Sequence, residues 1–535
     1  MLSTYTYPRY AYRRPPDFER PNQRYPVVIV GAGPVGLSAA IDLRLKNIPV
    51  VVVDEDDTVS VGSRGVCYAK RTLEILDRLG VGDRVLAKGV SWNVGRTFFR
   101  DNEVYRFNLV PEPDHERPGM VNLQQYYLEE YLVERALELG VDLRFRQKVR
   151  GVTVRADSAH LEIESPDGVY TLTSDWLVAA DGARSPIRRA LGHDIDGQVF
   201  HDRFLIADVV MKAGFPPERW FWFDPPFHPN QSVLLHRQAD DVWRIDFQLG
   251  WDADPELEKT PERVIPRIQA MLGDDREFEL EWVSVYTFQC RRMGQFRHGR
   301  ALFIGDAAHQ VSPFGARGAN SGIQDADNLG WKLSLVIQGK APESLLDSYH
   351  EERAAAADEN ILNSTRSTDF ITPKSSVSRL FRNAALTLAE TCPFAQRLVN
   401  SGRLSVPSFY TDSSLNSADT DAFQTVLVPG APAADAPLAD GSWLLRRLTR
   451  GFTALLFAES IGDYSAELQR LMALQSDPIP VETLLVEITD AIRDRYDARP
   501  GTVYLLRPDQ HVAGRWRTTE LDAIRSAVAR ACAQA

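Results

Sequence analysis

YPVVIVGAGPVG, residues 25–36, places three glycines directly after a run of β-branched residues. LSAAIDLRLKN and then IPVVVVD follow, so the predicted order is strand, tight turn, helix and strand. Uninterrupted Val and Ile runs are typical of strands that are buried on both faces of a parallel sheet. In this setting Gly31 permits the tight turn, Gly33 lets the backbone approach a pyrophosphate, and Gly36 lets helix and strand pack closely.

This segment predicts a dinucleotide site. A helix that begins at Pro34 offers free N–H groups and a positive partial charge to a phosphate. Asp54 ends the next strand, 23 residues after Gly31, where an acidic side chain can accept hydrogen bonds from a ribose. Glu55, beside it, is a second acidic candidate. An ordinary glycine turn is the alternative, and this segment alone does not separate FAD from NAD.

Two later segments narrow the cofactor. LVAADGARSPIR at residues 177–188 is a strand that ends in Asp-Gly, and GRALFIGDAAH at residues 299–309 is a strand that ends in Gly-Asp. A glycine-rich stretch, PFGARGANSGIQDA, follows the second. Together with the glycine turn, in this order and spacing, these segments resemble the group A FAD-dependent aromatic hydroxylases, whose founding member is p-hydroxybenzoate hydroxylase. The resemblance covers about residues 26–370.

The resemblance implies FAD and suggests its contacts. Asp306 is placed to accept hydrogen bonds from ribitol hydroxyls, and Asp181 marks the Asp-Gly motif. A helix cap for Asp306 and a hairpin turn for Asp181 are the alternatives. The glycine-rich stretch opens a long helix, whose N-terminus can stabilise the negative charge of reduced flavin. The residues expected around the flavin here are Gly305, Pro313, Gly318, Ala319 and Asn320.

Further contacts follow from the same resemblance. Arg64, in GSRGV, matches an arginine of the family that contacts the cofactor, and Gln125, in QYYLE, matches a glutamine at a helix start. Both could instead be surface polar residues. Arg317 departs from the pattern because many relatives have Gln there, and an arginine can change the flavin's electrostatics or contact an acidic substrate.

The implied chemistry is hydroxylation of a phenolic aromatic compound. NADH or NADPH reduces FAD, dioxygen gives a flavin hydroperoxide, and its distal oxygen attacks the ring. A base must activate the phenol and water must be excluded. His236, Arg244 and Tyr286 on predicted strands, with Pro313 beside the flavin, are the catalytic candidates, although each strand residue could simply pack or face solvent. Aromatic residues at 220–227, with Trp243 and Phe247, are predicted to line a dry pocket.

The predicted fold class is α/β. A Rossmann-like FAD-binding domain carries an inserted, mostly antiparallel substrate sheet and is followed by an α/β domain that resembles the thioredoxin-like domain of phenol, 3-(3-hydroxyphenyl)propionate and polyketide hydroxylases. That last domain has no CxxC, so we expect a structural or dimer-stabilising role. The predicted boundaries are an N-terminal arm at 1–25, the FAD domain at 26–199 and 291–370, the insert at 200–290, a helical connector and linker at 371–424, and the thioredoxin-like domain at 425–535.

Composition limits the other functions. The net charge of -12 argues against a nucleic-acid partner, and four scattered cysteines argue against a disulfide framework or a metal site. The first residues lack a secretory signal, and no apolar run is long enough to span a membrane, so a cytoplasmic protein is expected. The expected assembly is a homodimer. A hydroxylase of a polyketide or antibiotic, a flavin-dependent reductase, and a flavin-binding interaction protein remain alternatives. A halogenase is disfavoured because the W-x-W-x-I-P pattern is missing.

Overall fold

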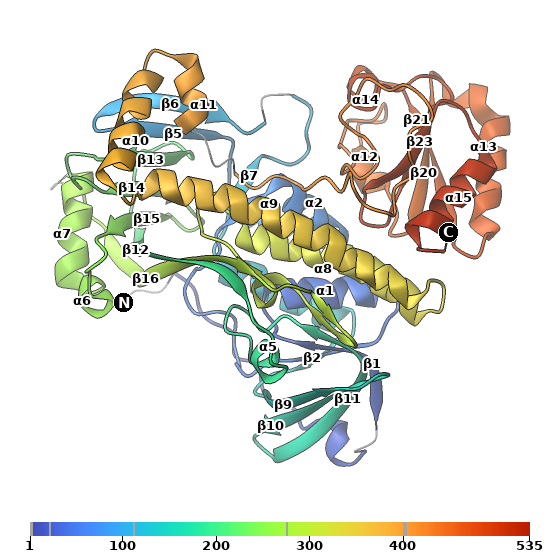
Figure 1. The fold of residues 1–535 in the computed structure, drawn as a ribbon, viewed down its shortest axis with the longest axis horizontal. Helices are drawn as coiled ribbons and strands as arrows, with labels where there is room; N and C mark the ends of the chain where they lie inside the picture. The colour runs from blue at the N-terminus through green and yellow to red at the C-terminus, as the bar shows by residue number, and fades with distance from the viewer. Residues whose placement is uncertain (1–3, 21–22, 111–112, 274–275, 400–403, 535) are drawn as a thin grey trace.

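The computed structural model describes residues 4–20, 23–110, 113–273, 276–399 and 404–534. Figure 1 shows two large sheets, two long helices (α8 and α9) crossing the middle of the molecule, and a C-terminal unit at the far end of those helices. Within the described residues, no helix combines the length and the apolarity that crossing a bilayer demands.

The first large sheet contains the glycine turn. Its strands are ordered β17-β18-β11-β1-β2-β8, and they are parallel from β18 to β8, whereas β17 is antiparallel to β18. Strands β9 and β10 extend from β11. Helices α1, α4 and α8 pack together with it, and the side chains at its centre are fully buried, as continuous Val and Ile runs predict. The elements are β1 (Arg24–Val30), α1 (Pro34–Leu45), β2 (Val50–Val53), α4 (Gln125–Glu138), β8 (Asp142–Arg144), β9 (Lys148–Val154), β10 (Ala159–Ser165), β11 (Gly168–Ala179), β17 (Arg297–His298), β18 (Ala301–Phe303) and α8 (Gly318–Ile337).

The second large sheet is antiparallel except where β13 meets β5. Its order is β19-β16-β12-β15-β14-β13-β5-β6, so it extends beyond the predicted insert and recruits β5 and β6 from much earlier in the chain. Short helices α6 (Pro255–Glu258) and α7 (Pro261–Leu272) follow β15. The strands are β5 (Val94–Phe99), β6 (Asn102–Asn108), β12 (Asp196–Val210), β13 (Arg219–Phe223), β14 (Ser232–Arg237), β15 (Val242–Leu249), β16 (Glu279–Arg292) and β19 (His309–Gln310).

A small antiparallel sheet joins the two large ones. It is ordered β3-β7-β4, and helices α2 and α3 lie between its strands in the chain. The N-terminal arm lies against this region through Tyr5, which is buried and stacks on Tyr126 with ring centroids 4.2 Å apart. The elements are β3 (Cys67–Ala69), α2 (Lys70–Leu79), α3 (Gly82–Lys88), β4 (Val90–Trp92) and β7 (Met120–Asn122).

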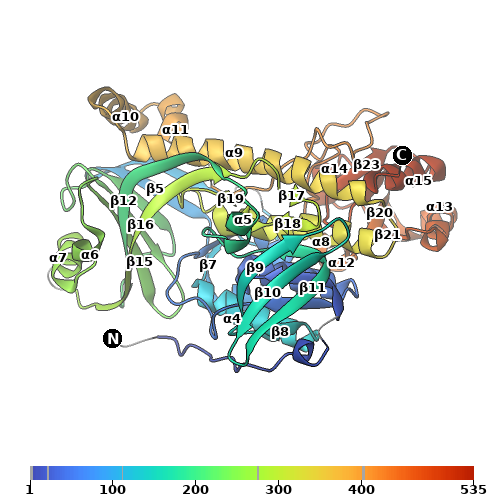
Figure 2. The same cartoon turned by 60° about the horizontal axis from the view of Figure 1, so that its bottom comes forward.

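The C-terminal unit has a four-stranded mixed sheet, ordered β21-β20-β22-β23, in which only β20 and β21 are parallel. It is anchored by a buried ion pair between Arg507 and Glu352, a residue of α9, with N–O distances of 2.6 and 3.0 Å. Figure 2 shows α9 running from the second large sheet to this unit. The remaining elements are α9 (Asp347–Ile371), α10 (Ser376–Ala389), α11 (Pro393–Val399), α12 (Leu444–Arg447), β20 (Phe452–Ala458), α13 (Ser465–Met472), β21 (Val481–Glu487), α14 (Asp490–Tyr496), β22 (Val503–Leu506), β23 (Val512–Trp516) and α15 (Leu521–Ala531).

Candidate functional site

The three glycines of the turn occupy three different environments. Gly31 has φ +107°, and a Cβ there would overlap the carbonyl of Ala180. A Cβ on Gly36 would overlap the carbonyl of Gly31, so this glycine is required for helix α1 to approach β1. In the part of the chain that the structure describes, no atom lies within 4 Å of the Cβ position of Gly33, and no side chain caps the N-terminus of α1, which begins at Pro34. The space beside Gly33 and these free N–H groups fit a pyrophosphate.

Asp54 ends β2 and turns its carboxylate toward the glycine turn. Its Oδ2 accepts a hydrogen bond from the N–H of Ala32 at 2.6 Å, and its Oδ1 accepts one from Asp56 at 2.9 Å. Burial raises the pKa of Asp54 to about 6, although these two donors oppose the shift. Glu55 instead extends to the surface, where it pairs with Lys148 at 2.6 Å.

The two motif aspartates carry unused acceptor atoms. Asp181 accepts from the N–H of Ile187 at 3.0 Å, but its Oδ1 is buried and has no partner among the described residues. Asp306 is exposed and its carboxylate accepts no hydrogen bond from the described part of the chain, yet surrounding protein desolvates this carboxyl and raises its pKa. A carboxyl group that is exposed but desolvated lies in a recess of the protein surface. A ribitol chain with several hydroxyls would supply the donors that these carboxylates lack.

Arg64 faces the same recess. Its side chain is exposed, and its charge acts on both Asp306 and Tyr286. Gln125 fixes the loop that carries Arg64, because its Oε1 accepts a hydrogen bond from the N–H of Gly65 at 2.8 Å. Gln125 also donates to Glu129 at 2.7 Å, so the structure uses this side chain to fix the Arg64 loop.

The Gly-Asp loop is organised by Asp325, a residue of α8 that sequence reasoning did not select. Asp325 accepts from the N–H of Gly305 at 2.9 Å, from His309 Nε2 at 2.7 Å and from Arg353 Nε at 2.6 Å. Burial alone would raise the pKa of Asp325, but His309 and Arg353 outweigh it and hold the pKa low. His309 therefore positions the loop. In the sequence, only the position of His309 within the Gly-Asp motif pointed to this hydrogen-bond network.

The start of α8 is open toward the recess. No side chain caps this helix, and a Cβ on Gly318 would meet nothing closer than 3.8 Å. Pro313 is exposed and Ala319 is half-buried, whereas Asn320 is buried and accepts from the N–H of Ala69 at 2.8 Å. Arg317 donates to the carbonyl of Phe314 at 2.9 Å. Asn320 thus ties α8 to β3, and the helix N-terminus stays available for a flavin ring.

Arg244 is not a free catalytic group. It is buried and forms a bidentate pair with Asp208 on β12, with N–O distances of 2.8 and 2.9 Å. The same guanidinium donates to the carbonyl of Ser63, next to Arg64. Arg244 was predicted to act directly in catalysis. Its hydrogen bonds instead connect the second sheet to the Arg64 loop, which is a positioning role.

Strand register brings polar residues together on one face of the second sheet. Arg219 on β13 lies opposite His236 on β14, which lies opposite Arg244 on β15. Directly opposed residues of antiparallel strands point to the same face. His236 is buried, its Nδ1 lies 3.3 Å from Asn122 Nδ2, and its Nε2 has no partner among the described residues. Burial, together with the charges of Arg219 and Arg244, lowers the pKa of His236 well below its usual value, so this histidine is neutral.

Asp246 and Tyr286 belong to the same face. Asp246 lies two residues beyond Arg244 on β15, and Tyr286 lies opposite Phe204 on β16. Asp246 Oδ1 and the Tyr286 hydroxyl are buried and have no partner within the described residues. Burial raises the pKa of Asp246 to about 7 and that of Tyr286 to about 12, although Arg244 opposes both shifts.

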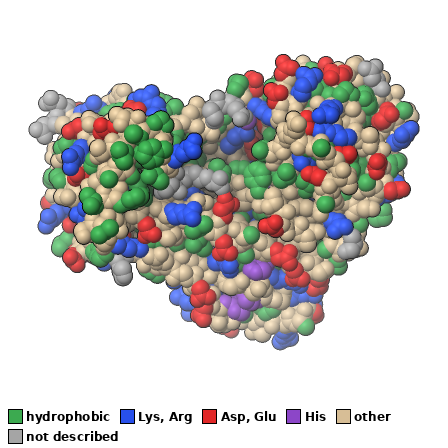
Figure 3. Space-filling view, turned by 45° about the horizontal axis from the view of Figure 1, so that its top comes forward, with side chains coloured by type: hydrophobic (Ala, Val, Ile, Leu, Met, Phe, Trp, Pro, Cys, Tyr) green, Lys and Arg blue, Asp and Glu red, His purple; other side chains and the backbone are tan. Residues whose placement is uncertain are grey.

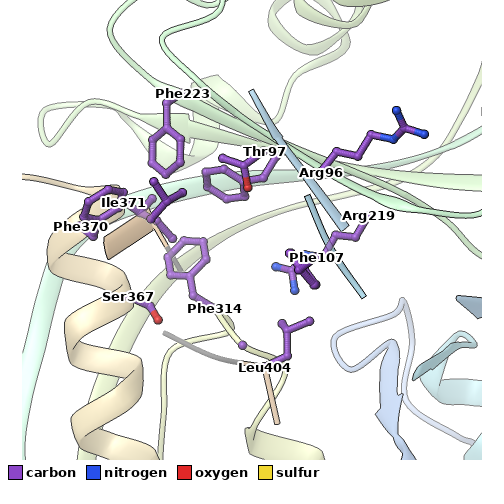
Figure 4. A pocket seen from close by; sticks show the side chains of 13 residues that line it. Arg96, Thr97, Phe107, Arg219, Phe223, Phe314, Ser367, Phe370, Ile371 and Leu404 are labelled. Carbon is purple, nitrogen blue, oxygen red and sulfur yellow. The ribbon is translucent and has the colours of Figure 1, made fainter. Parts of the chain in front are cut away.

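An apolar pocket with a cavity volume of about 90 Å³ opens beside this face. Figure 4 shows phenylalanines from the sheet, from α9 and from the loop before α8 converging on it. The lining residues are Arg96, Thr97, Phe107, Arg219, Phe221, Phe223, Phe314, Gly315, Ser367, Phe370, Ile371, Val399 and Leu404. Trp243 and Phe247, predicted to line such a pocket, instead pack in an apolar cluster with residues of α7 on the opposite face of the sheet.

Two polar residues of this site were missed in the sequence. Arg219 and Asp246 stand beside aromatic residues in strands whose alternation is visible, but nothing local shows which strands become neighbours. The register of β13, β14 and β15 supplies that information.

Comparisons with known proteins agree with this geometry. A model of the FAD binding domain family matches residues 24–364. The 6-methylpretetramide 4-monooxygenase of Streptomyces rimosus is 31% identical over 534 residues, which cover 94% of this chain and 92% of that protein. The 3-(3-hydroxy-phenyl)propionate/3-hydroxycinnamic acid hydroxylase of Mycolicibacterium smegmatis is 28% identical over 528 residues, covering 91% and 90%. The flavin-dependent monooxygenase PieE, solved with FAD and substrate, shares the fold with a TM-score of 0.80 at 23% identity, over 96% of this chain and 100% of that one.

Proposed function

Because this chain belongs to the FAD-binding-domain family of flavin-dependent monooxygenases, we propose that it hydroxylates a phenolic aromatic compound with dioxygen and NADH or NADPH. The observation that carries the proposal is the apolar pocket between the Phe314 loop and the polar face of the second sheet. Bound FAD supplies electron transfer from the nicotinamide and activation of dioxygen.

Different residues of the recess would hold different parts of the cofactor. The N-terminus of α1 beside Gly33 would receive the pyrophosphate, and Asp54 would receive the adenosine ribose. Asp306 would accept from ribitol hydroxyls, and the N-terminus of α8 at Gly318 would stabilise the negative charge of the reduced flavin. Arg64, whose charge acts on Asp306, would contact the cofactor as well. The described residues form no second nucleotide fold, so the nicotinamide would bind transiently beside the flavin.

The pocket residues orient and activate the substrate. Phe221, Phe223 and Phe314 pack against an aromatic ring and keep water from the reacting position. Asp246 is the proposed base, because its Oδ1 is buried, unpartnered and on the pocket's side of the sheet. It takes the phenolic proton, directly or through the Tyr286 hydroxyl, which makes the ring more electron-rich.

The pH dependence of catalysis tests this assignment. We expect kcat/KM to fall as the pH drops through about 7, where burial places the pKa of Asp246, and to level off above it. Asp246→Asn should lower kcat by about 100-fold, within the usual contribution of a general base. It should also remove the acidic limb of the profile. Tyr286→Phe is the companion variant. An unchanged acidic limb in Asp246→Asn would exclude Asp246 as the base.

The reaction itself is tested by measuring NADH and NADPH oxidation with a panel of phenols, hydroxylated aromatic acids and polycyclic polyketides. Oxygen uptake, hydrogen peroxide and product mass are followed together. A product heavier by one oxygen, with little peroxide, establishes a hydroxylase. Nicotinamide oxidation without oxygen insertion establishes a reductase.

A hydroxylase of a polyketide is the second candidate. The relative from Streptomyces rimosus favours it, because that protein is named for a 6-methylpretetramide and aligns over nearly the whole chain. Activity with polycyclic phenols and none with single-ring phenols would select this candidate.

The C-terminal unit is proposed to be thioredoxin-like and structural, in a cytoplasmic homodimer. Its mixed sheet and flanking helices support the fold, and all four cysteines of the chain are free, which supports a reducing compartment. An apolar surface on α10 and α11, visible on the left lobe in Figure 3, supports the dimer. Its exposed residues are Val377, Leu380, Phe381, Leu388, Phe394 and Leu398.

Light scattering tests the homodimer. The wild type should have twice the chain mass of 60.1 kDa, and Leu380→Glu with Phe381→Glu should give the chain mass itself, because buried carboxylates oppose association. Leu137→Glu, at an exposed apolar residue elsewhere, is the control. A monomeric wild type, or a double variant that stays dimeric, contradicts this surface.

A further inference from the structure

Arg219 is a cation without a partner. It lies on β13, and its residue is only 9% exposed. It makes no hydrogen bond and no ion pair with the described part of the chain. Figure 4 shows its guanidinium turned toward the pocket, near Phe107 and Phe314, whereas Arg96 points away. Arg96 pairs with Glu218 on the opposite face of the sheet, with Nη2 and Oε1 3.0 Å apart.

The acidic groups near Arg219 do not neutralise it. Asp208 is engaged in its bidentate pair with Arg244. Asp246 acts on Arg219 electrostatically but forms no ion pair with it, and Cys67 is a neutral thiol because burial raises its pKa to about 11. His236, directly opposite, is neutral as well. Within the described residues, the face therefore carries one guanidinium whose fork has no acceptor.

A buried charge without a counter-charge is costly, and an arginine cannot escape the cost by losing its proton. Burial does lower the pKa of Arg219, but arginine remains charged at any ordinary pH. A buried charge without a partner is retained where a bound ligand supplies the counter-charge. Five N–H donors in a planar fork match a carboxylate, which accepts two parallel hydrogen bonds.

We propose that Arg219 binds the carboxylate of the substrate, so that the enzyme acts on a phenolic acid and not on an uncharged polycyclic compound. The aromatic ring then lies against Phe221 and Phe314, with the acid group at Arg219 and the phenol toward Asp246 on the same sheet face. This assignment rests on the proposed hydroxylase function and names its substrate class.

Binding to the FAD-loaded, oxidised enzyme tests the assignment without turnover. The probes are hydroxybenzoates, hydroxyphenylacetates and 3-(3-hydroxyphenyl)propionate, each beside its primary amide, followed by calorimetry and by the change in flavin absorbance. At least one acid should bind about tenfold more tightly than its amide, as a charge-assisted bidentate pair predicts. Arg219→Met should remove that preference by weakening only the acid, and Arg219→Lys should keep part of it.

Arg237→Met is the matched control, because it removes a cation from the adjacent strand β14 on the opposite face, where Arg237 pairs with Asp241 at 2.7 Å. It should leave acid and amide binding unchanged. The melting temperature of Arg219→Met should equal or exceed that of the wild type, since an unpaired buried charge is lost. A drop in melting temperature as large as the loss of binding would indicate a structural role and overturn the proposal.

The remaining outcomes separate this inference from the proposed function. If no acid binds more tightly than its amide, or if Arg219→Met binds acids as the wild type does, the inference is wrong. If uncharged polycyclic phenols are hydroxylated equally by both proteins, the inference is wrong and the hydroxylase function stands. If an acid binds through Arg219 but no oxygenated product forms, the inference stands and the hydroxylase function fails.

Discussion

Replacing Gly33 with valine should weaken FAD binding by at least about 100-fold, equivalent to about 2.7 kcal/mol, while the apoprotein folds normally. None of the described residues lies within 4 Å of the Cβ position of Gly33, and its φ of −77° suits any residue. A valine side chain therefore meets no protein atom, but it occupies the space that a pyrophosphate needs. Titration of the apoprotein with FAD, followed by flavin fluorescence, measures the affinity, and circular dichroism checks the fold.

Two other glycines provide controls for this experiment. Gly214→Val also adds a side chain in open space, and it should bind FAD as the wild type does. Gly36→Val should fail to fold, because its Cβ would overlap the carbonyl of Gly31. Wild-type FAD affinity in Gly33→Val would mean that the pyrophosphate does not lie at this turn.

Replacing Arg507 with methionine should destabilise the protein by about 3–5 kcal/mol, the usual cost of removing one partner of a buried ion pair. Arg507 is fully buried and pairs with Glu352 at 2.6 and 3.0 Å and with Asp509 at 3.0 Å. Burial alone would raise the pKa of Glu352, but Arg507 and Lys332 hold it low, so the variant leaves charged carboxylates short of partners. Calorimetry should show a new transition at lower temperature, as the C-terminal unit separates first.

An exposed ion pair supplies the control. Arg525 pairs with Asp477 at 2.9 Å, and the two side chains are 43% and 26% exposed. Arg525→Met should therefore cost less than about 1 kcal/mol. Equal effects of the two substitutions would mean that the Arg507 pair does not anchor the C-terminal unit.

The cofactor half of the site was predictable because its signals are local. Gly31, Gly33 and Gly36 lie within six residues, and each performs a task that backbone geometry alone defines. Asp181 and Asp306 each lie within three residues of the end of the strand that positions them. The long helix after Asp306 was also predicted, and Gly318–Ile337 forms α8 although it contains Gly322 and Gly330.

The substrate half depends on contacts between distant segments. An arginine can bind a substrate or a carboxylate of the protein equally well, so the residue type does not reveal the partner of Arg244. Only the pairing of β12 with β15 shows that this partner is Asp208. Arg219 becomes a pocket residue because β13 pairs with β14 on one side and with β5, more than a hundred residues earlier, on the other. Alternation along a strand shows that successive side chains point to opposite faces of the sheet. Which face lines the pocket depends on how the strands pair.

Helix α9 also determines where the pocket wall stands. It has 25 residues and is therefore about 37 Å long. Glu352, near its start, is bonded to the C-terminal unit, while Ser367 and Phe370, near its end, line the pocket. A stiff rod held at one end acts as a strut for the other. The last hundred residues contribute none of the lining side chains named above, yet they brace the wall against which a substrate would rest.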